Sequence, residues 1–341
     1  MENENLLTPN KNNLRIVAVL LALVAFAGYI NFTKNKTTKV SQETSKPELT
    51  KINVAFPALG TTYNGQIGTI LQNNPEILKN NKLDAKVTPY GTGREMKVAL
   101  VAGKEDVMIS SESVFLIMVG QGFDAYTISS LGAEGKMALV VNSKSKVKEI
   151  KELKGKKVAT MFGTSPHKPA VQWLKDAGLT PGKDVELVNL PNAEALRIAL
   201  ETNQIDAAVL WDPYVTDGAD KGIHKVIVDT ELDLVTVMSK SFADQNPQAI
   251  ANFNQSLKDA ALYLINHKDE MATAYSATTK LDTSLIKKVS LLNKNYNATD
   301  INGVDISINP TLLEKLQGNE SFLFQEKLIN KDFKVTDYIK Q

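Results

Sequence analysis

Residues 87–113, VTPYGTGREMKVALVAGKEDVMISSES, and residues 187–213, LVNLPNAEALRIALETNQIDAAVLWDP, share one pattern at an offset of 100. In both copies an Ala-Leu pair lies in a predicted helix, an exposed turn follows, and an Asp opens an apolar strand. The aligned pairs are Val87 with Leu187, Ala99 with Ala199, Leu100 with Leu200, and Asp106 with Asp206. This repeat predicts two lobes with the same local topology.

A strand, a loop and a helix precede each copy and extend the repeat. Gly60-Thr61-Thr62 in the first loop corresponds to Gly163-Thr164-Ser165 in the second, and the later strands end at Ser111 and Trp211. Strands that alternate with helices predict an α/β fold whose parallel sheet is covered on both faces. Four loops at the carboxyl ends of strands, two from each lobe, are therefore expected to face one ligand cleft.

The chain is expected to cross between the lobes twice, because a strand leaves the first lobe and LDLVTVMSKSF at residues 232–242 returns to it. Two crossings form a hinge. The expected divisions are residues 51–138 for the first part of lobe 1, 139–234 for lobe 2, and 235–341 for the return to lobe 1 with C-terminal helices.

Residues 1–32 contain an apolar segment, LRIVAVLLALVAFAGYINF, that runs from Leu14 to Phe32. Its length and the basic residues at its start are typical of an export signal or a short membrane anchor, so both cleavage and retention are open. A polar linker at residues 33–50 follows. The folded part is therefore expected outside the cytoplasm. Because the chain has no Cys, it is not expected to be a lipoprotein.

Composition excludes several classes of protein. The 39 Lys and Arg residues balance 38 Asp and Glu residues, so no net charge drives the chain onto nucleic acid. With no Cys and 3 scattered His, thiolate catalysis, disulfides and a metal site are not expected. Met96 replaces the third glycine of a dinucleotide fingerprint at residues 91–96, so NAD binding is not expected. We expect a monomer without a cofactor.

The loop Gly163-Thr164-Ser165, followed by Pro166 and His167, has two interpretations. A nucleophilic serine would need a base and an orienting acid, but no Gly-x-Ser-x-Gly elbow is present and His167 need not face Ser165. A helix that starts here instead presents free N–H groups and a positive dipole end to an anion. Thr164 and Ser165 add hydroxyls, and either side chain is equally suited to cap the helix. The chain is therefore not expected to be an enzyme.

Four further segments carry a resemblance to a known family: LKGKKVATMFGTSPH, DVELVNLP, ALETNQIDAAVLWDPY and FADQNPQAIANF. Over residues 51–270 the chain resembles the nitrate/sulfonate/taurine/bicarbonate branch of ABC-transporter substrate-binding proteins. This resemblance implies a two-lobed type II periplasmic-binding-protein fold with a ligand cleft between the lobes. It also implies capture of a small anionic solute, by lobe closure, for delivery to an ABC permease and its ATPase.

The expected ligand contacts combine both copies of the repeat. They are Gly60, Thr61, Thr62, Ser110, Ser111, Gly163, Thr164, Ser165, His167, Trp211 and Asp212. His167 resembles the family's usual His after this loop and is either a rim hydrogen-bonding residue or solvated. Trp211 is expected to stack on the ligand and donate its N–H. Asp212 is expected either to cap the helix that Pro213 begins or to offer its carboxylate to a ligand's ammonium or hydroxyl group.

Two charged residues and two alternative functions stay open. Arg94 either pairs with an oxyanion or is solvated, and Glu112 has no assigned role, although its charge would repel an uncompensated anion. The same scaffold resembles binding proteins for pyrimidine or for thiamin and flavin precursors. It also resembles pyrimidine-forming thiamin-biosynthesis enzymes, which are intracellular and carry a cysteine-rich motif that this chain lacks.

Overall fold

The computed structural model of the protein describes residues 48–58 and 61–341. The predicted export segment at residues 1–32, most of the predicted linker, and Gly60 lie outside the described residues. Within the described part of the chain, no helix is both long enough and apolar enough to cross a membrane.

The strands form one mixed eight-stranded sheet in the order β2-β1-β3-β8-β4-β7-β5-β6. The strands are β1 (Thr50–Pro57), β2 (Leu83–Tyr90), β3 (Val107–Ser111), β4 (Ala125–Asn142), β5 (Lys157–Thr160), β6 (Glu186–Asn189), β7 (Ala207–Trp211) and β8 (His224–Ser239). Consecutive strands are joined by α-helices, as the alternating pattern predicts, except for β4 and β5. The expected parallel sheet is instead mixed, because β4 and β8 pair antiparallel with each other and with β7 and β3.

The helices lie between the strands along the chain and after the last strand. They are α2 (Thr62–Asn73), α3 (Pro75–Asn80), α4 (Gly93–Val101), α5 (Glu112–Gly120), α6 (His167–Asp176), α7 (Ala193–Glu201), α8 (Tyr214–Asp220), α9 (Lys240–Gln245), α10 (Pro247–Asn266), α11 (Lys268–Thr279), α12 (Thr283–Ser290) and α13 (Pro310–Gln325). Short 3₁₀ turns are η1 (Ile150–Leu153), η2 (Lys294–Asn297), η3 (Ile301–Gly303) and η4 (Val335–Tyr338).

The two copies of the sequence repeat have the same topology. In the first, β1 lies parallel to β2 and β3, and β3 pairs antiparallel with β8. In the second, β5 lies parallel to β6 and β7, and β7 pairs antiparallel with β4. The register also repeats, because Val54 faces Val107 in one copy and Val158 faces Ala207 in the other. The predicted internal repeat is confirmed.

The aspartates that open β3 and β7 explain part of the repeat. Asp106 donates its N–H to the carbonyl of Asn53 at 2.9 Å, and its carboxylate accepts the Asn53 N–H at 2.7 Å. Asp206 makes the equivalent pair with Lys157, at 2.9 Å in both directions. Each aspartate therefore aligns the start of its strand with the neighbouring parallel strand and satisfies a backbone donor at the sheet end.

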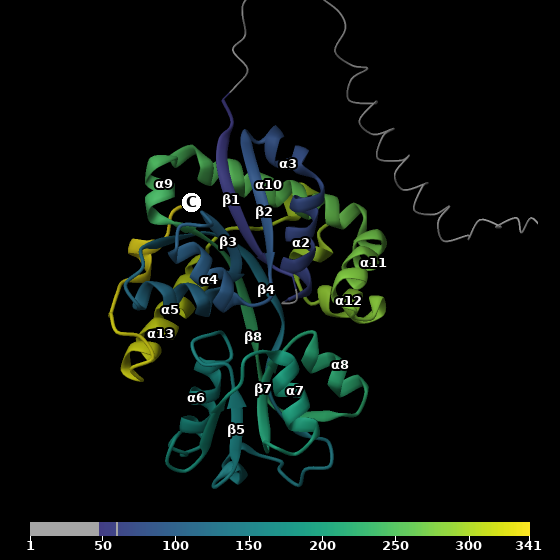
Figure 1. The fold of residues 1–341 in the computed structure, drawn as a ribbon, viewed down its shortest axis with the longest axis vertical. Helices are drawn as coiled ribbons and strands as arrows, with labels where there is room; N and C mark the ends of the chain where they lie inside the picture. Colours follow the sequence, from purple (N-terminus) through teal and green to yellow (C-terminus); the bar gives the residue numbers. More distant parts are fainter. Residues whose placement is uncertain (1–47, 59–60) are drawn as a thin grey trace, which may run out of the picture. The chain divides into compact units, whose positions relative to one another are not determined.

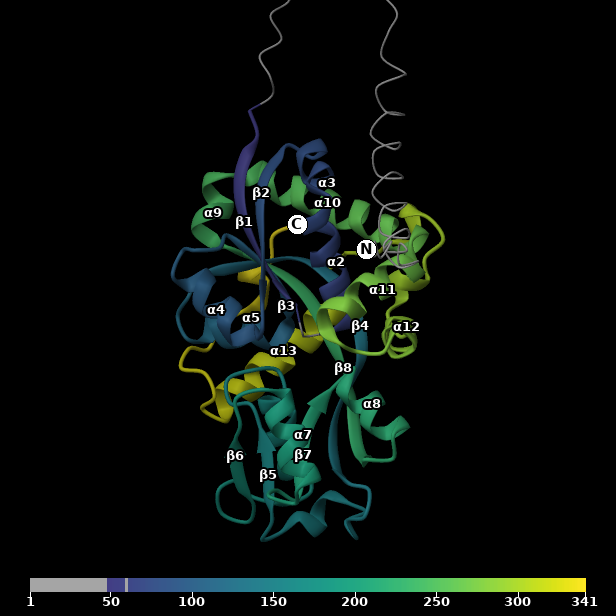
Figure 2. The same ribbon diagram turned by 45° about the vertical axis from the view of Figure 1, so that its right-hand side comes forward.

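Strands β4 and β8 connect the two lobes. They are 18 and 16 residues long, and they pair with each other along most of their length. Figures 1 and 2 show both running from the group with β1, β2 and β3 into the group with β5, β6 and β7. The predicted crossings are thus continuous strands, and the proposed lobe limits at 138 and 234 fall inside them.

The C-terminal region packs on lobe 1 but also reaches lobe 2. The predicted apolar face of α10 is buried, and Asn309 caps α13 by accepting the Leu312 N–H at 2.9 Å. Helix α13 packs on α5 of lobe 1 and also contacts α6 of lobe 2. Lys168 on α6 donates to Asn319 Oδ1 at 2.9 Å and lies 5.5 Å from the centre of the Phe322 ring. The long Lys168 side chain of α6 makes both of these contacts between the lobes.

Candidate functional site

A cavity of about 340 Å³ lies between the two copies of the repeat. Its walls come from the connections that follow six parallel strands: β1–α2, β2–α4, β3–α5, β5–α6, β6–α7 and β7–α8. The lining residues are Pro57, Thr61, Asn64, Gly91, Thr92, Gly93, Glu95, Met96, Ser110, Ser111, Val114, Met161, Thr164, Ser165, Pro166, Asn192, Ala193, Glu194, Trp211, Tyr214, Leu232 and Leu234. The cavity is therefore at the edge of the sheet where open α/β folds bind ligands.

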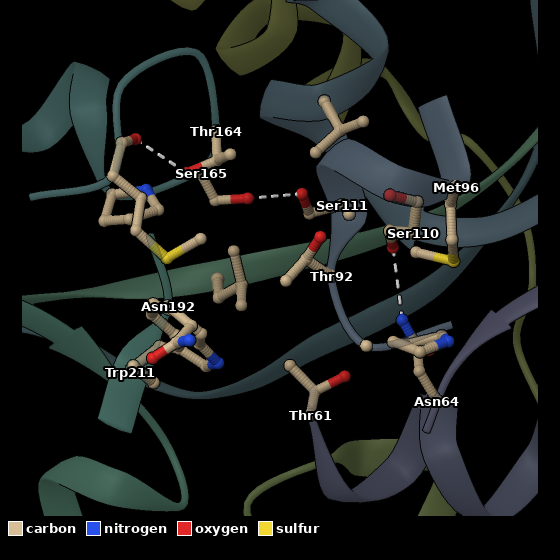
Figure 3. Close-up of a pocket in the computed structure, with 18 of the residues that line it drawn as sticks. Thr61, Asn64, Thr92, Met96, Ser110, Ser111, Thr164, Ser165, Asn192 and Trp211 are labelled. Atoms are coloured by element: carbon tan, nitrogen blue, oxygen red, sulfur yellow. Dashed lines mark hydrogen bonds between the residues drawn. The ribbon is translucent and has the colours of Figure 1, made fainter. Parts of the chain in front are cut away.

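The structure brings six of the predicted contacts together around this cavity. They are Thr61, Ser110, Ser111, Thr164, Ser165 and Trp211. Ser111 from lobe 1 and Ser165 from lobe 2 meet directly, with their Oγ atoms 2.6 Å apart (Figure 3). Thr164 donates its hydroxyl to the Met161 carbonyl at 2.7 Å, which shapes the turn before α6. Hydroxyls from the two halves of the repeat thus share one site.

Four of the predicted contacts are described but do not line the cavity: Thr62, Gly163, His167 and Asp212. Thr62 is buried and donates its hydroxyl to Glu134. Gly163 has a φ of +71°, and nothing lies within 4 Å of where a Cβ would be, so its left-handed backbone is what requires glycine. As ligand contacts these residues stay predictions.

His167 faces its own loop. Its ring stacks on Phe162 at 4.6 Å, and its Nδ1 accepts the Gly163 N–H at 3.2 Å. Burial lowers the pKa of His167 to about 4, so the ring is neutral near pH 7. Because Nδ1 is occupied and the Ser165 hydroxyl bonds Ser111, the two residues do not form a base and nucleophile pair in this arrangement.

Asp212 connects the hinge to α8. Its carboxylate is buried and accepts the Thr216 N–H at 2.9 Å and the Lys136 N–H at 2.7 Å. The first bond satisfies a backbone N–H in the first turn of α8, from the residue that precedes the N-cap Pro213. The second bond holds β4 at the end of a register shift between Ala133 and Lys136. The geometry matches the capping alternative for Asp212.

Two lining residues that cap helices were not among the predicted contacts. Thr92 accepts the Glu95 N–H at 3.2 Å at the start of α4, and Asn192 accepts the Ala195 N–H at 2.8 Å at the start of α7. The two caps are 100 residues apart and therefore occupy equivalent positions in the repeat. The repeat could have revealed both residues, because they follow the equivalent strands β2 and β6. The sequence predictions had assigned only the other four strand ends to the cleft.

The lining residues in the described part of the chain include no Lys, Arg or His. Two lining acids already have partners: Glu95 accepts the Gly91 and Thr92 N–H groups at 2.9 and 3.1 Å, and Glu194 pairs with Arg197 at 2.6 Å. Within residues 48–58 and 61–341, no three His, Asp or Glu side chains gather to hold a metal ion. Polarity at this cavity comes from hydroxyls, amides and helix starts.

Glu134 lies behind the first turn of α2 and was not anticipated. It is 1% exposed, and its Oε1 accepts the Tyr63 N–H at 2.7 Å and the Thr62 hydroxyl. Its Oε2 has no partner among the described residues. Burial raises the pKa of Glu134 to about 7, and the nearby Asp212 carboxylate adds to the rise. This acid therefore occupies backbone N–H groups at the start of α2.

Arg94 and Glu112 now have defined surroundings. Arg94 on α4 donates to the Phe162 carbonyl at 2.5 Å, which joins lobe 1 to the β5–α6 loop of lobe 2. Glu112 is buried, accepts the Ser113 hydroxyl at 2.7 Å, and has a pKa raised first by burial and then by Asp233. Arg94 is exposed, as the solvated interpretation expects, and its hydrogen-bond partner is a carbonyl across the cleft.

Known proteins with similar sequences are named as binding proteins, whereas one solved structure with this fold is a desulfurization enzyme. The chain is 27% identical over 264 residues to a Bacillus subtilis (strain 168) protein named as an aliphatic sulfonates-binding protein, covering 75% of this chain and 76% of that one. It is 34% identical over 141 residues to a taurine-binding periplasmic protein of Escherichia coli (strain K12), covering 39% and 42%.

A solved structure shares the fold. The periplasmic aliphatic sulphonate binding protein SsuA from Escherichia coli superposes with a TM-score of 0.71 at 19% identity, covering 85% of this chain and 97% of that one. The predicted α/β fold, of the two-lobed periplasmic-binding-protein type, is confirmed. The NMT1-like family matches residues 45–278, which is more than half of the sequence. The described fold, the repeat and this match together show that the chain belongs to the NMT1-like family.

Proposed function

We propose that this protein is the extracytoplasmic solute-binding component of an ABC importer and that it captures a small organic anion of the sulfonate type. The observation that carries the proposal is the cavity itself, which is built from equivalent loops of both lobes and is bridged by the Ser111–Ser165 contact. A solute between the lobes would favour the closed arrangement because only that arrangement contacts it from both sides.

The polar part of the cavity suits an oxyanion without a basic side chain. Hydroxyls of Ser110, Ser111 and Ser165 lie at the starts of α5 and α6, where the helix dipoles are positive. Ser111 makes no side-chain cap to α5, so it does not satisfy the first-turn donors of that helix. Donors of this kind bind an anion well in a site that excludes water.

The apolar part of the cavity favours an organic rather than an inorganic anion. Met96, Val114, Met161, Leu232 and Leu234 line it together with the Trp211 ring. A cavity of about 340 Å³ falls at the small end of the usual range for small-molecule sites, about 300–1,000 Å³. Nitrate or bicarbonate would leave this apolar surface uncovered, whereas an alkyl chain on a sulfonate would cover it.

Thermal unfolding tests this proposal directly. We expect a short alkanesulfonate at one hundred times its dissociation constant to add roughly 2.7 kcal/mol to the free energy of unfolding, because it binds only the folded state. Nitrate, bicarbonate and pyrimidines serve as the competing ligands in the same screen. Stabilisation by nitrate or by a pyrimidine, with no effect of any sulfonate, would contradict the sulfonate assignment.

Arg94 provides a test of closure. Replacing Arg94 with Ala removes a hydrogen bond between the lobes, so we expect ethanesulfonate to bind about two- to tenfold more weakly. Lys97→Ala is the matched control, because Lys97 lies on the same helix and bonds only Gln121 of lobe 1 at 3.0 Å. Titration calorimetry on both variants distinguishes the two. Equal affinities in Arg94→Ala and the unmodified protein would show that this contact does not favour the bound form.

We also propose that the chain binds its solute without chemistry. The arrangement of Ser165 and His167 supports this, since the serine bonds another serine and the ring nitrogen Nδ1 accepts a backbone N–H. The partners would be an ABC permease and its ATPase, and the protein would act as a monomer outside the cytoplasm. Whether residues 1–32 are cleaved or anchor the protein to a membrane stays a prediction, because they lie outside the described residues.

A second candidate, a binding protein for a pyrimidine or a thiamin or flavin precursor, is favoured by one feature. Trp211 and Tyr214 both line the cavity and meet edge to face, with ring centres 5.9 Å apart. An aromatic face of this kind stacks planar heterocycles as well as alkyl chains. The pyrimidine samples in the unfolding screen separate this candidate from the sulfonate proposal.

A further inference from the structure

Two buried polar atoms at the start of α2 lack a partner among the described residues: Thr61 Oγ1 and Asn64 Oδ1. Both residues line the cavity, and they are only 7% and 1% exposed. Figure 3 shows the Thr61 hydroxyl directed toward the interior of the cavity. A buried polar atom without a hydrogen bond costs about 1–3 kcal/mol, so these two atoms are expected to be satisfied by whatever fills the cavity.

The chemistry of Asn64 determines what kind of group can satisfy it. Its Nδ2 donates to the Ser110 carbonyl at 3.1 Å (Figure 3). Because a carbonyl oxygen only accepts, the amide nitrogen must face Ser110, and the remaining amide atom is the acceptor Oδ1. A partner for Oδ1 must therefore bring an O–H or N–H group, and an alkanesulfonate without substituents has neither.

Glu134 makes the same end of the cavity unsuitable for an oxyanion. Its carboxylate accepts the Tyr63 N–H at 2.7 Å and the Thr62 hydroxyl, so donors at the start of α2 are already used. In its ionised form, which is present above about pH 7, this carboxylate also offsets the positive end of the helix dipole. The Ser111–Ser165 hydroxyl pair lies on the other side of the cavity in Figure 3. Glu112 begins α5 beside this pair, but its carboxyl accepts the Ser113 hydroxyl and is bonded to neither Ser111 nor Ser165.

We propose that the cavity selects a dipolar solute, with an anionic head at the Ser111 and Ser165 hydroxyls and a hydroxyl or ammonium donor on Thr61 Oγ1 and Asn64 Oδ1. This inference rests on the proposed binding function and narrows its ligand class to short sulfonates that carry a donor group on the alkyl chain. Asn64 is then a residue that determines specificity, because it discriminates between solutes with the same head group.

Three sulfonates of nearly equal size test the inference: ethanesulfonate, 2-hydroxyethanesulfonate and 2-aminoethanesulfonate. With the full chain in titration calorimetry, we expect at least one donor-bearing sulfonate to bind about tenfold or more tighter than ethanesulfonate. In Thr61→Val and in Asn64→Leu this preference should fall below about threefold, while the affinity for ethanesulfonate is retained. Thr61→Val is nearly isosteric and removes no hydrogen bond that the side-chain hydroxyl makes in the protein, so it decides the matter if Asn64→Leu fails to fold.

Thr160→Val is the matched control. Thr160 on β5 is also fully buried with an unpartnered hydroxyl, but it does not line the cavity, so its removal should leave the preference unchanged. Equal binding of all three sulfonates to the unmodified protein would overturn the inference and leave the proposed sulfonate-binding function intact. A preference that survives in both site variants would also overturn it. If no sulfonate binds, the proposed function fails, and the inference fails with it.

Discussion

Gly68→Ala is expected to lower the free energy of unfolding by about 3 kcal/mol, although alanine normally stabilises a helix relative to glycine. Gly68 lies inside α2, and a Cβ there would come within 2.1 Å of Phe56 Cγ. Phe56 on β1 is almost fully buried, so it has no free space into which to move. Urea unfolding followed by circular dichroism measures the change.

Gly318→Ala on α13 is the control for this prediction. Gly318 is also in a helix, but nothing lies within 4 Å of the position of a Cβ, so only helix propensity should act. We expect that variant to be more stable by up to about 1 kcal/mol. If Gly68→Ala matches Gly318→Ala instead, the close packing of α2 on β1 is wrong.

Glu134→Gln is expected to have a large, pH-dependent effect on stability. Burial raises the pKa of Glu134 from its ordinary 4.5 to about 7, so the folded protein favours the neutral carboxyl. The stability that this group contributes is fully present below about pH 4.5 and is lost as the pH rises through about 7. Glutamine keeps the acceptor for Tyr63 and Thr62 and stays neutral at every pH.

We therefore compare the free energies of unfolding of Glu134→Gln and of the unmodified protein. Their difference should shift by about 3 kcal/mol in favour of the glutamine variant between roughly pH 5 and pH 8. Urea unfolding without ligand at both pH values measures this difference. Glu76→Gln, at an exposed position on α3, is the control and should show no such trend. A constant difference between Glu134→Gln and the unmodified protein would mean that water reaches the carboxylate.

The sequence was sufficient to predict two lobes of equivalent local topology and six of the residues that line the cavity. The offset of 100 residues predicted two equivalent lobes, because the same spacing of apolar residues and the same strand-opening aspartates, Asp106 and Asp206, place the same strands side by side. Ser111 and Trp211 were then predicted at the cleft because they end parallel strands. Local periodicity predicts where the strands lie, and the shared direction of parallel strands predicts which of their ends face the cleft.

Other site residues could not be recognised from local patterns. Asn64 is one amide in a helix that contains Gly65 and Gly68, and nothing near it in the sequence shows that Ser110 would orient it. Glu134 lies 71 residues from Tyr63, and the hydrogen bond between them exists only because β4 passes behind α2. Its pKa shift also depends on burial, which is a property of the packed molecule.

Asp212 shows most clearly what the sequence determines and what only the tertiary structure determines. Its position after a strand and before Pro213 allowed either a helix cap or a ligand carboxylate, and both need the same residue at the same place in the sequence. In the tertiary structure β4 brings the Lys136 N–H to one carboxylate oxygen and α8 brings the Thr216 N–H to the other, which is the arrangement that the capping alternative expects. The sequence by itself determined that strands alternate with helices and that this pattern repeats in two lobes. Only tertiary packing decided which polar atoms are satisfied inside the protein and which, like Thr61 Oγ1 and Asn64 Oδ1, are left for a ligand, because a hydrogen bond depends on distances between residues that are far apart in the chain.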